Sequence, residues 1–382
     1  MKIPKDVDYI LNKLEDNNYE AYVVGGCVRD FLMHKEAADW DITTSALPCE
    51  IKKVFNHTFD TGIDHGTITV VLNKINYEVT TFRIDGEYSD NRRPNSVEFT
   101  RDIVKDLERR DFTINAIAYN KKIGYVDPFH GMEDIKKGII RGVGNAALRF
   151  QEDALRMIRA IRFAGKTGFV IEEKTYVAIK ENNYLFKNIS AERVRIEFEK
   201  LLLSQYSNKM ELLIDCELMK YFNEEFHEHL KNNWKVYTLE NHIQGFSLLL
   251  REYNKVKELL QDFKYDNKTI KSVLKVVKAL HITTSNNGFD NRKFICEFLD
   301  DIEDVIKTKE LLGWDISYLN KFYLEALEKK YPLKIKDLDI NGNILMEKGY
   351  KGKEVGEILN NMLEFVLEYP EKNNKNELLD TL

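Results

Sequence analysis

The chain has 382 residues, of which 43% are hydrophobic and 31% charged, and its formal net charge is −6. This length suits two or more domains, and the composition excludes a long disordered chain. The negative charge argues against binding nucleic acid by bulk attraction, so any such surface must be local. The sequence has no apolar run of membrane-spanning length, no signal-peptide pattern and only four scattered cysteines. We therefore expect a cytoplasmic protein with no membrane partner.

The first 120 residues predict a small mixed α/β domain built on a twisted sheet. Turn-forming residues separate short apolar segments that favour strands, and Asn73-Lys74 suits a hairpin. In chain order we expect a helix at 3–18, a strand at 21–24, a short helix at 28–33, a strand at 40–44, a helix at 48–54 and strands at 57–61, 67–72 and 75–82.

From Arg149 onward, strand patterns nearly vanish and helical periodicity dominates. The expected fold class is therefore α+β, with one mixed sheet followed by all-helical domains. We place the domain boundaries near residues 145, 205 and 330, which gives segments 1–145, 146–205, 206–330 and 331–382.

Asp39 and Asp41 are the most informative pair of side chains. In an extended segment alternate residues point the same way, so these carboxylates share one face. Their hard oxygen atoms suit Mg²⁺, which takes substrate phosphates as further ligands. The preceding turn, Gly25-Gly26, leads into a helix and offers backbone N–H donors to those phosphates. Together these features predict a two-metal site for phosphoryl or nucleotidyl transfer.

A second charged stretch runs from Glu152 to Gly165. Between 153 and 165 its only charges are Asp153, Arg156, Arg159 and Arg162, and a helix apolar around most of its circumference is usually buried. We expect one helix whose winding arginines need an anion, such as a nucleoside triphosphate, to offset their desolvation. The alternative is a structural network of salt bridges with Glu152 or Glu172.

Asp153 and Arg156 suggest how a base is chosen. Three residues apart on one helix, they are neighbours, and a carboxylate accepts hydrogen bonds where a guanidinium donates them. Cytosine and adenine both present an amino donor beside an acceptor ring nitrogen, whereas uracil and guanine place a carbonyl there. The pair can therefore select C and A without a nucleic-acid template, provided that the nucleotide lies against this helix.

These motifs resemble those of the class II tRNA nucleotidyltransferases, the CCA-adding enzymes of the polymerase-β-like nucleotidyltransferase superfamily. The resemblance is dense over about the first 205 residues and loose beyond, where Asn341-Gly-Asn-x-Leu-Met346 is similar to the bacterial tail domain. The ordered matches are Gly25-Gly26-x-Val-Arg29-Asp30, Asp39-x-Asp41-Ile-x-Thr44, Arg109-Arg110-Asp111-Phe112-Thr113-Ile114-Asn115-Ala116, Asp127-Pro-Phe-x-Gly131-x-x-Asp134-Ile and Glu152-Asp153-x-x-Arg156-x-x-Arg159-x-x-Arg162-Phe.

The resemblance implies a polymerase-β-like catalytic head at 1–145, a base-recognising neck at 146–205, a helical body at 206–330 and a tRNA-binding tail at 331–382. It implies that Asp39 and Asp41 are the catalytic residues and hold the two Mg²⁺ ions, with Asp111 near the sugar and phosphates. The nucleotide-binding residues that it implies are Gly26, Arg29, Arg110, Asp153, Arg156, Arg159 and Arg162.

The implied reaction is the addition of C, C and A to the 3′ end of tRNA from CTP and ATP, with release of pyrophosphate. The segment Asp85-Gly-x-Tyr88-x-Asp90-x-Arg92-Arg93-Pro94 is similar to the family's flexible loop, which is needed to add the terminal A.

An A-adding-only enzyme, a poly(A) polymerase and, more distantly, a non-enzymatic RNA-binding module share these motifs and stay as alternatives. The sequence leaves two further points open: whether Glu78 is a third catalytic carboxylate, and the oligomeric state, for which a homodimer is one option.

Overall fold

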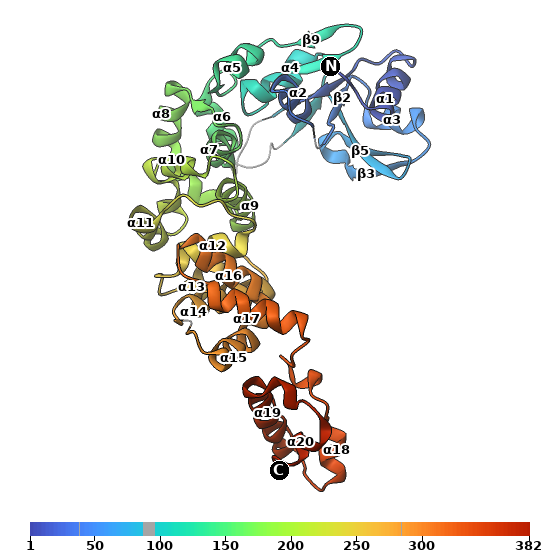
Figure 1. Ribbon diagram of the computed structural model, residues 1–382. Coiled ribbons are helices and arrows are strands. Elements are labelled where there is room, and N and C mark those ends of the chain that lie inside the picture. The colour runs from blue at the N-terminus through green and yellow to red at the C-terminus, as the bar shows by residue number, and fades with distance from the viewer. Residues whose placement is uncertain (38, 87–95, 284) are drawn as a thin grey trace. The chain divides into compact units, whose positions relative to one another are not determined.

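The computed structural model describes residues 1–37, 39–86, 96–283 and 285–382. The chain forms two compact units, Met1–Val236 and Tyr237–Leu382, which we call the first and second units. Within the described residues, all strands belong to the first unit and the second unit is helical (Figure 1). The expected α+β fold, with a mixed sheet followed by helices, is confirmed.

A seven-stranded sheet forms the N-terminal part of the first unit, in the order β3-β4-β5-β2-β1-β8-β9. In this sheet β2 and β5 are parallel and the other neighbours are antiparallel. The bounds are β1 Ala21–Val24, β2 Ile42–Thr44, β3 Thr58–Gly62, β4 Thr67–Leu72, β5 Ile75–Thr81, β8 Ala118–Asn120 and β9 Gly124–Val126.

Side chains of β1 alternate between two hydrophobic clusters, as the pleat of a strand requires. Val23 packs in the cluster that includes buried residues of helices α1 (Lys5–Glu15) and α3 (Pro48–Val54). Tyr22 and Val24 pack in the cluster on the other face, which includes Ile103 and Leu107 of α4 (Ile103–Glu108). The sheet is therefore covered on both faces and forms a rigid base for the residues at its strand ends.

The hairpin expected at Asn73-Lys74 joins β4 and β5. Both residues have positive φ, 51° and 66°, which is the backbone conformation that two-residue hairpins favour. Because hairpin geometry fixes the register, Leu72 pairs with Ile75 and Ile68 pairs with Val79 in the core.

Two smaller sheets were not expected from the sequence. Strand β6 (Arg83–Asp85) pairs with β7 (Val97–Phe99), and β10 (Ile139–Ile140) pairs with β11 (Val170–Ile171). The segment 85–94, which is similar to the family's flexible loop, thus begins at the last residue of β6, and its residues 87–94 lie outside the described residues.

The charged stretch from Glu152 is divided between two helices, which corrects the single helix expected there. Helix α6 ends at Glu152, Asp153 has extended φ and ψ of −137° and 102°, and α7 begins at Leu155. Helices α6 and α7 are two of the eight helices that follow β1 in the described residues of this unit, apart from α3 and α4 given above. Their bounds are α2 Gly26–Leu32, α5 Gly131–Lys137, α6 Ala146–Glu152, α7 Leu155–Thr167, α8 Glu173–Asn182, α9 Ala191–Leu202, α10 Met210–Asp215 and α11 Glu224–Asn233.

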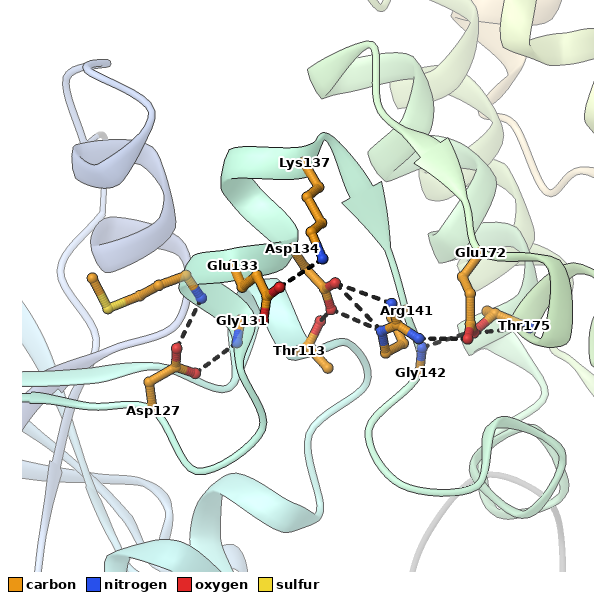
Figure 2. A network of polar contacts seen from close by, with 11 residues as sticks. Thr113, Asp127, Gly131, Glu133, Asp134, Lys137, Arg141, Gly142, Glu172 and Thr175 are labelled. Carbon is orange, nitrogen blue, oxygen red and sulfur yellow. Dashed lines mark hydrogen bonds and ion pairs between the residues drawn. The ribbon is translucent and has the colours of Figure 1, made fainter.

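A network of polar contacts joins α5 to the start of α8 (Figure 2). The carboxylate of Asp127 accepts hydrogen bonds from the backbone N–H groups of Gly131 and Met132, and so caps α5. Asp134 accepts from Thr113 and Arg141, and Arg141 also pairs with Glu172. A Cβ at Gly131 would lie 2.1 Å from the carbonyl oxygen of Thr113, so only glycine fits. The motif from Asp127 to Asp134 is therefore structural.

The second unit contains two hydrophobic clusters, one around Phe294, Phe298 and Leu319 and one around Leu345, Met362 and Leu378. None of the described helices is long and apolar enough to cross a membrane. The division into four domains stays a prediction. The helices are α12 His242–Leu250, α13 Val256–Asp262, α14 Asn267–Leu280, α15 Gly288–Phe298, α16 Ile302–Leu311, α17 Ser317–Glu328, α18 Gly342–Glu347, α19 Lys353–Glu368 and α20 Lys375–Leu379.

Candidate active site

The turn between β1 and α2 depends on Gly25. Its φ of +76° lies in the region that favours glycine, and a Cβ there would come within 3.0 Å of Arg110 Nη1 and 4.0 Å of Asp41 Oδ2. Helix α2 begins at the next residue, Gly26, so the N–H groups of its first turn lack intrahelical acceptors. The turn therefore brings backbone N–H donors, the guanidinium of Arg110 and the carboxylate of Asp41 close together.

Asp39 and Asp41 precede β2 rather than lying within it. Both side chains are solvent-exposed, and the carbonyl oxygen of Asp41 accepts a hydrogen bond from the N–H of Val24, which extends the ladder between β1 and β2. Neither carboxylate makes an ion pair or a side-chain hydrogen bond with any residue that the structure describes. Of the two acids, Asp41 has its carboxylate beside the glycine turn, and the assignment of both to a metal site stays a prediction.

The environment of Asp41 is short of positive charge. Partial desolvation by the surrounding protein raises the pKa of the Asp41 carboxyl above its usual value, the charge of Asp39 raises it further, and only Arg110 opposes them. Two accessible carboxylates without protein partners are a donor set that fits a hard divalent cation. Asp39 and Asp41 thus pass the chemical test for holding such an ion.

Glu78 does not join them in a recognisable cluster. It is exposed on β5, one residue before Val79, which pairs with Ile42 of β2. Across the described ranges, no group of three or more His, Cys, Asp or Glu side chains is arranged to hold a metal ion. A third carboxylate at this site stays a prediction.

Arg110 lies between two acidic groups. Its Nη2 is 3.3 Å from Oδ2 of the fully buried Asp106, whereas its Nη1 faces the Gly25 turn. Its Nε is buried and has no hydrogen-bond partner in the described structure. Arg110 therefore retains donor capacity on the side of Asp41, as a phosphate ligand requires.

Arg29, from the first turns of α2, is almost fully buried at 3% exposure. It donates to Asp30 through Nε and Nη2, and its Nη1 lies 2.6 Å from Oδ1 of Asn115. The Nη2 atom would be 3.8 Å from a Cβ on Gly26, so Arg29 lies directly beneath the turn. Its positive charge reaches the turn, although each of its three nitrogen atoms already donates a hydrogen bond to a protein group.

The carboxylate of Asp153 and the guanidinium of Arg156 do not pair with each other. Asp153 accepts from Arg193 Nη2 at 2.8 Å and from the N–H of Leu155, whereas Arg156 pairs with Glu152 at 2.6 Å. Asp153 lies between α6 and α7 and not on the helix of Arg156, so the expected placement of both on one helix face was wrong, although the N–H of Arg156 donates to the carbonyl oxygen of Asp153 at 3.0 Å. Each still has hydrogen-bonding capacity left, because a carboxylate has about four acceptor positions and a guanidinium five donors.

Arg159 and Arg162 are compensated by protein carboxylates. Arg159 pairs with Asp111 at 2.6 Å and Arg162 with Glu197 of α9 at 2.8 Å. The argument that the arginines of this stretch need a nucleotide as counter-ion was therefore wrong, and the alternative of a salt-bridge network, with Glu152 among its members, is what the structure contains. Burial alone would raise the pKa of the Asp111 carboxyl, but the charge of Arg159, hydrogen bonds from Asn115 and Arg159, and the charge of Arg156 together outweigh it and hold this pKa down to about 2.

Sequence reasoning gave no role to Asn115 and missed Glu197 and Asp106. Asn115 connects the two halves of the site, because it accepts from Arg29 and donates to Asp111. Glu197 and Asp106 are buried at 5% and 0% exposure, and each pairs with two arginines. Each lies in a helix that also has apolar residues, and the sequence of an amphipathic helix does not indicate which distant residue a single acidic side chain contacts.

Three family descriptions match the chain in succession. The Poly A polymerase head domain matches residues 21–141, the "Probable RNA and SrmB- binding site of polymerase A" matches 168–230, and a tRNA nucleotidyltransferase domain 2 matches 237–382. The matches together span both compact units, and the first contains Gly25, Asp41 and Arg110.

Whole proteins are also similar. A CCA-adding enzyme of Limosilactobacillus reuteri (strain DSM 20016) is 41% identical over 388 residues, which cover 97% of this chain and 94% of that protein. A CCA-adding enzyme of Geobacillus sp. (strain WCH70) is 38% identical over 346 residues, covering 88% and 86%. The crystal structure of the Bacillus stearothermophilus CCA-adding enzyme in complex with CTP has a TM-score of 0.88 and 32% identity, and covers 100% of this chain and 98% of its own.

Proposed function

Because the chain belongs to the family of CCA-adding enzymes, we infer that it is a nucleotidyltransferase that adds C, C and A to the 3′ end of tRNA. The reaction uses CTP and ATP, needs no nucleic-acid template and releases pyrophosphate. The observation that carries this proposal is the pair of unpartnered carboxylates, Asp39 and Asp41, of which Asp41 lies beside the Gly25 turn and Arg110. Relatives named CCA-adding enzymes, 38–41% identical over most of their length, and a 32% identical one crystallised with CTP support the choice of substrates.

The glycine turn and two arginines would bind the triphosphate. The first N–H groups of α2, from Gly26, and the donors of Arg110 that face the turn are placed for phosphate oxygens. Arg29 adds positive charge beneath the turn. Bound in this way, the α-phosphate is oriented toward Asp39 and Asp41, where the 3′-hydroxyl of the tRNA must attack it.

Asp39 and Asp41 would hold divalent cations, which the family uses, and we propose Mg²⁺. When bound, the two ions would activate the 3′-hydroxyl and neutralise the triphosphate and the leaving pyrophosphate. The protein's own contribution is to leave these carboxylates exposed and free of internal partners, since an ion pair with an arginine would compete with the cation.

Asp153 and Arg156 would read the base from the junction of α6 and α7. Arg156 is fixed by Glu152 and by the carbonyl oxygens of Arg149 and Arg109, and Asp153 is fixed by Arg193. Side chains held in this way pay little entropy when they bind a base, which favours discrimination. Arg159 and Arg162 would complete the pocket while their carboxylate partners hold them in place.

An incorporation assay tests the proposal. The protein is incubated with Mg²⁺, labelled CTP or ATP, and tRNA that lacks one, two or three terminal nucleotides. We expect two C residues on the fully trimmed tRNA, then a single A, and no further extension. ATP use without CTP use would identify an A-adding enzyme, and long homopolymers of A would identify a poly(A) polymerase. No incorporation with any tRNA, despite tRNA binding, would identify a non-enzymatic RNA-binding module.

We also propose a cytoplasmic location, because tRNA, CTP and ATP are present there. The oligomeric state, including the option of a homodimer, can be measured on the same preparation by light scattering.

A further inference from the structure

A carboxylate outside the motifs controls where Arg110 points. Asp106 of α4 is fully buried, and it is four residues before Arg110. Its Oδ2 accepts from Arg110 Nη2 at 3.3 Å, and its Oδ1 accepts from Arg109 at 2.7 Å. The two arginines hold the pKa of the Asp106 carboxyl below its usual range against the effect of burial, so it is ionised at neutral pH.

Asp106 also contacts two strands next to the site. The hydroxyl of Thr43, two residues after Asp41, lies 3.4 Å from Oδ2, and the backbone N–H of Arg83 lies 3.4 Å from Oδ1. Because these contacts come from β2 of the seven-stranded sheet and from β6 of a two-stranded sheet, the carboxylate is fixed by both sheets and not only by its own helix. It is thus a rigid anchor for the flexible side chain of Arg110.

Arg110 has two possible acidic partners, Asp106 on one side and Asp41 on the other. Arg110 Nη1 and Asp41 Oδ2 both border the Gly25 turn, 3.0 Å and 4.0 Å from where a Cβ on that glycine would lie, and within the described structure they form no ion pair. If Asp106 lost its charge, Asp41 would become the strongest remaining partner for this guanidinium. Arg110 would then turn away from its present direction and neutralise a carboxylate that the site needs free.

We propose that Asp106 is a positioning residue for nucleotide binding, which orients Arg110 toward the triphosphate and keeps it off Asp41. The inference rests on the proposed function, because it assumes that Arg110 binds phosphate. Asp106 touches neither the substrate nor the reacting atoms, so its removal should weaken binding of CTP and ATP to a similar extent, with kcat changing less than KM.

The test compares Asp106→Asn with Asp134→Asn, a matched control in the same unit. Asp134 is also a buried aspartate, 4% exposed, that accepts from a threonine hydroxyl and an arginine, but its partners Thr113 and Arg141 belong to the network around α5 (Figure 2). Both variants should lower the melting temperature. We expect only Asp106→Asn to raise KM for CTP and ATP, by about tenfold.

A double-mutant cycle decides whether the effect passes through Arg110. In an Arg110→Ala background, Asp106→Asn should leave KM unchanged, because there is no guanidinium left to orient. An equal rise in KM in both backgrounds, or a wild-type KM in folded Asp106→Asn, would overturn the proposal. Since the wild-type protein is assayed beside the variants, a failure of the proposed function would appear separately, as no incorporation by the wild type.

If Asp106→Asn does not fold, Asp106→Glu takes its place. This variant keeps the buried charge that the arginines need but moves the carboxylate outward by one methylene group. Arg110 should then be misplaced, and KM for both nucleotides should again rise. A folded Asp106→Glu variant with wild-type KM would show that the position of this carboxylate does not matter, which overturns the proposal.

Discussion

Two charged regions of the first unit are built on opposite rules. The arginines of α7 all have carboxylate partners within the protein, and those partners are Glu152, Asp111 and Glu197. The carboxylates of Asp39 and Asp41, in contrast, are exposed and have no such partner among the described residues. Paired charges can hold a framework in place, whereas accessible charges without partners are available to a ligand. On this comparison we expect the paired arginines to hold the shape of the proposed pocket, and the unpaired carboxylates to bind the cations.

Removing an unpaired charge should abolish activity without harming the fold. We expect Asp41→Asn to lower nucleotide incorporation by about a thousandfold or more, because cation binding supplies several kcal/mol to the transition state. The raised pKa of Asp41 means that its ionised form is disfavoured in the folded protein relative to the unfolded one. This penalty is present when the pH is above the folded pKa, so at neutral pH without divalent cations the variant should melt slightly above the wild type.

The two measurements are rapid-quench incorporation and calorimetry in a chelating buffer, with tRNA binding followed by filter retention as the control for folding. Unchanged turnover would refute the assignment of Asp41. A large fall in melting temperature would show that the carboxylate is a structural partner after all.

Removing a paired charge should instead lower the stability of the fold. Arg159→Met leaves the Asp111 carboxylate, whose side chain is 9% exposed, without its main counter-charge. Breaking a buried pair from one side costs about 3 kcal/mol. The pKa of Asp111 in the fold, about 2, lies below its ordinary value of 3.8, so its stabilising effect is present above about pH 4 and is lost as the pH falls through 2. The difference in the free energy of unfolding between the wild type and Arg159→Met should therefore become smaller as the pH falls.

Urea unfolding from pH 7 down to pH 3 checks this. Lys137→Met is the control, because the Lys137–Glu133 pair is exposed, with both side chains more than half accessible (57% and 56%), and such pairs contribute little (Figure 2). Equal stability losses in the two variants would contradict the structural role of the arginine network.

The sequence predicted much of the fold because its signals are local. Turn residues and alternating apolar positions placed β1, β4 and α3 at their observed bounds. The same local logic failed at Asp153, where an unbroken helical pattern conceals the extended residue between α6 and α7. A periodic pattern reports which residues are apolar, and it does not report a break that tertiary contacts impose.

The candidate site was predictable where short motifs carry the chemistry and was not where partners come from distant segments. Asp39, Asp41 and the glycine turn lie within 17 positions of one another, from 25 to 41, and follow from spacing. The contacts of Asp111 with Arg159 and of Arg162 with Glu197 join residues 48 and 35 positions apart. No pattern in one sequence assigns such pairs, so the arginines suggested a missing anion that the fold in fact supplies.

The junction between α6 and α7 tests an intermediate case, in which a residue has both a partner and a proposed ligand. Asp153 is held by Arg193 but keeps lone pairs for a base. We expect Asp153→Asn to raise incorporation of UTP and GTP relative to CTP and ATP by about tenfold, because the amide can donate to a carbonyl that the carboxylate repels. Competition assays with all four nucleotides measure this ratio. If UTP and GTP stay at background while CTP use only slows, base reading lies elsewhere.

Lys309 of α16, in the second unit, shows that a charge without an ion-pair partner does not by itself indicate a binding site. It is only 3% exposed, donates to the carbonyl of Ile282 at 2.8 Å, and lies 5.4 Å and 5.1 Å from the ring centres of Phe294 and Trp314. It has no ion pair with the described residues, and burial lowers its pKa to about 8 from 10.5. Unlike Asp41, it is closed to ligands.

A sealed charge should cost stability and serve no reaction. Below about pH 8 the fold must bury the charged ammonium, and this penalty disappears as the pH rises from 8 to 10.5. Lys309→Met should therefore gain about 1 kcal/mol at pH 7, after the loss of one hydrogen bond is deducted, with the gain gone near pH 10 and incorporation unchanged. Denaturant unfolding at both pH values measures the difference. A variant less stable than the wild type at pH 7 would mean that the carbonyl and the two rings compensate the charge. Asp41 and Lys309 would then differ in whether protein groups compensate the charge, and not only in whether solvent reaches it.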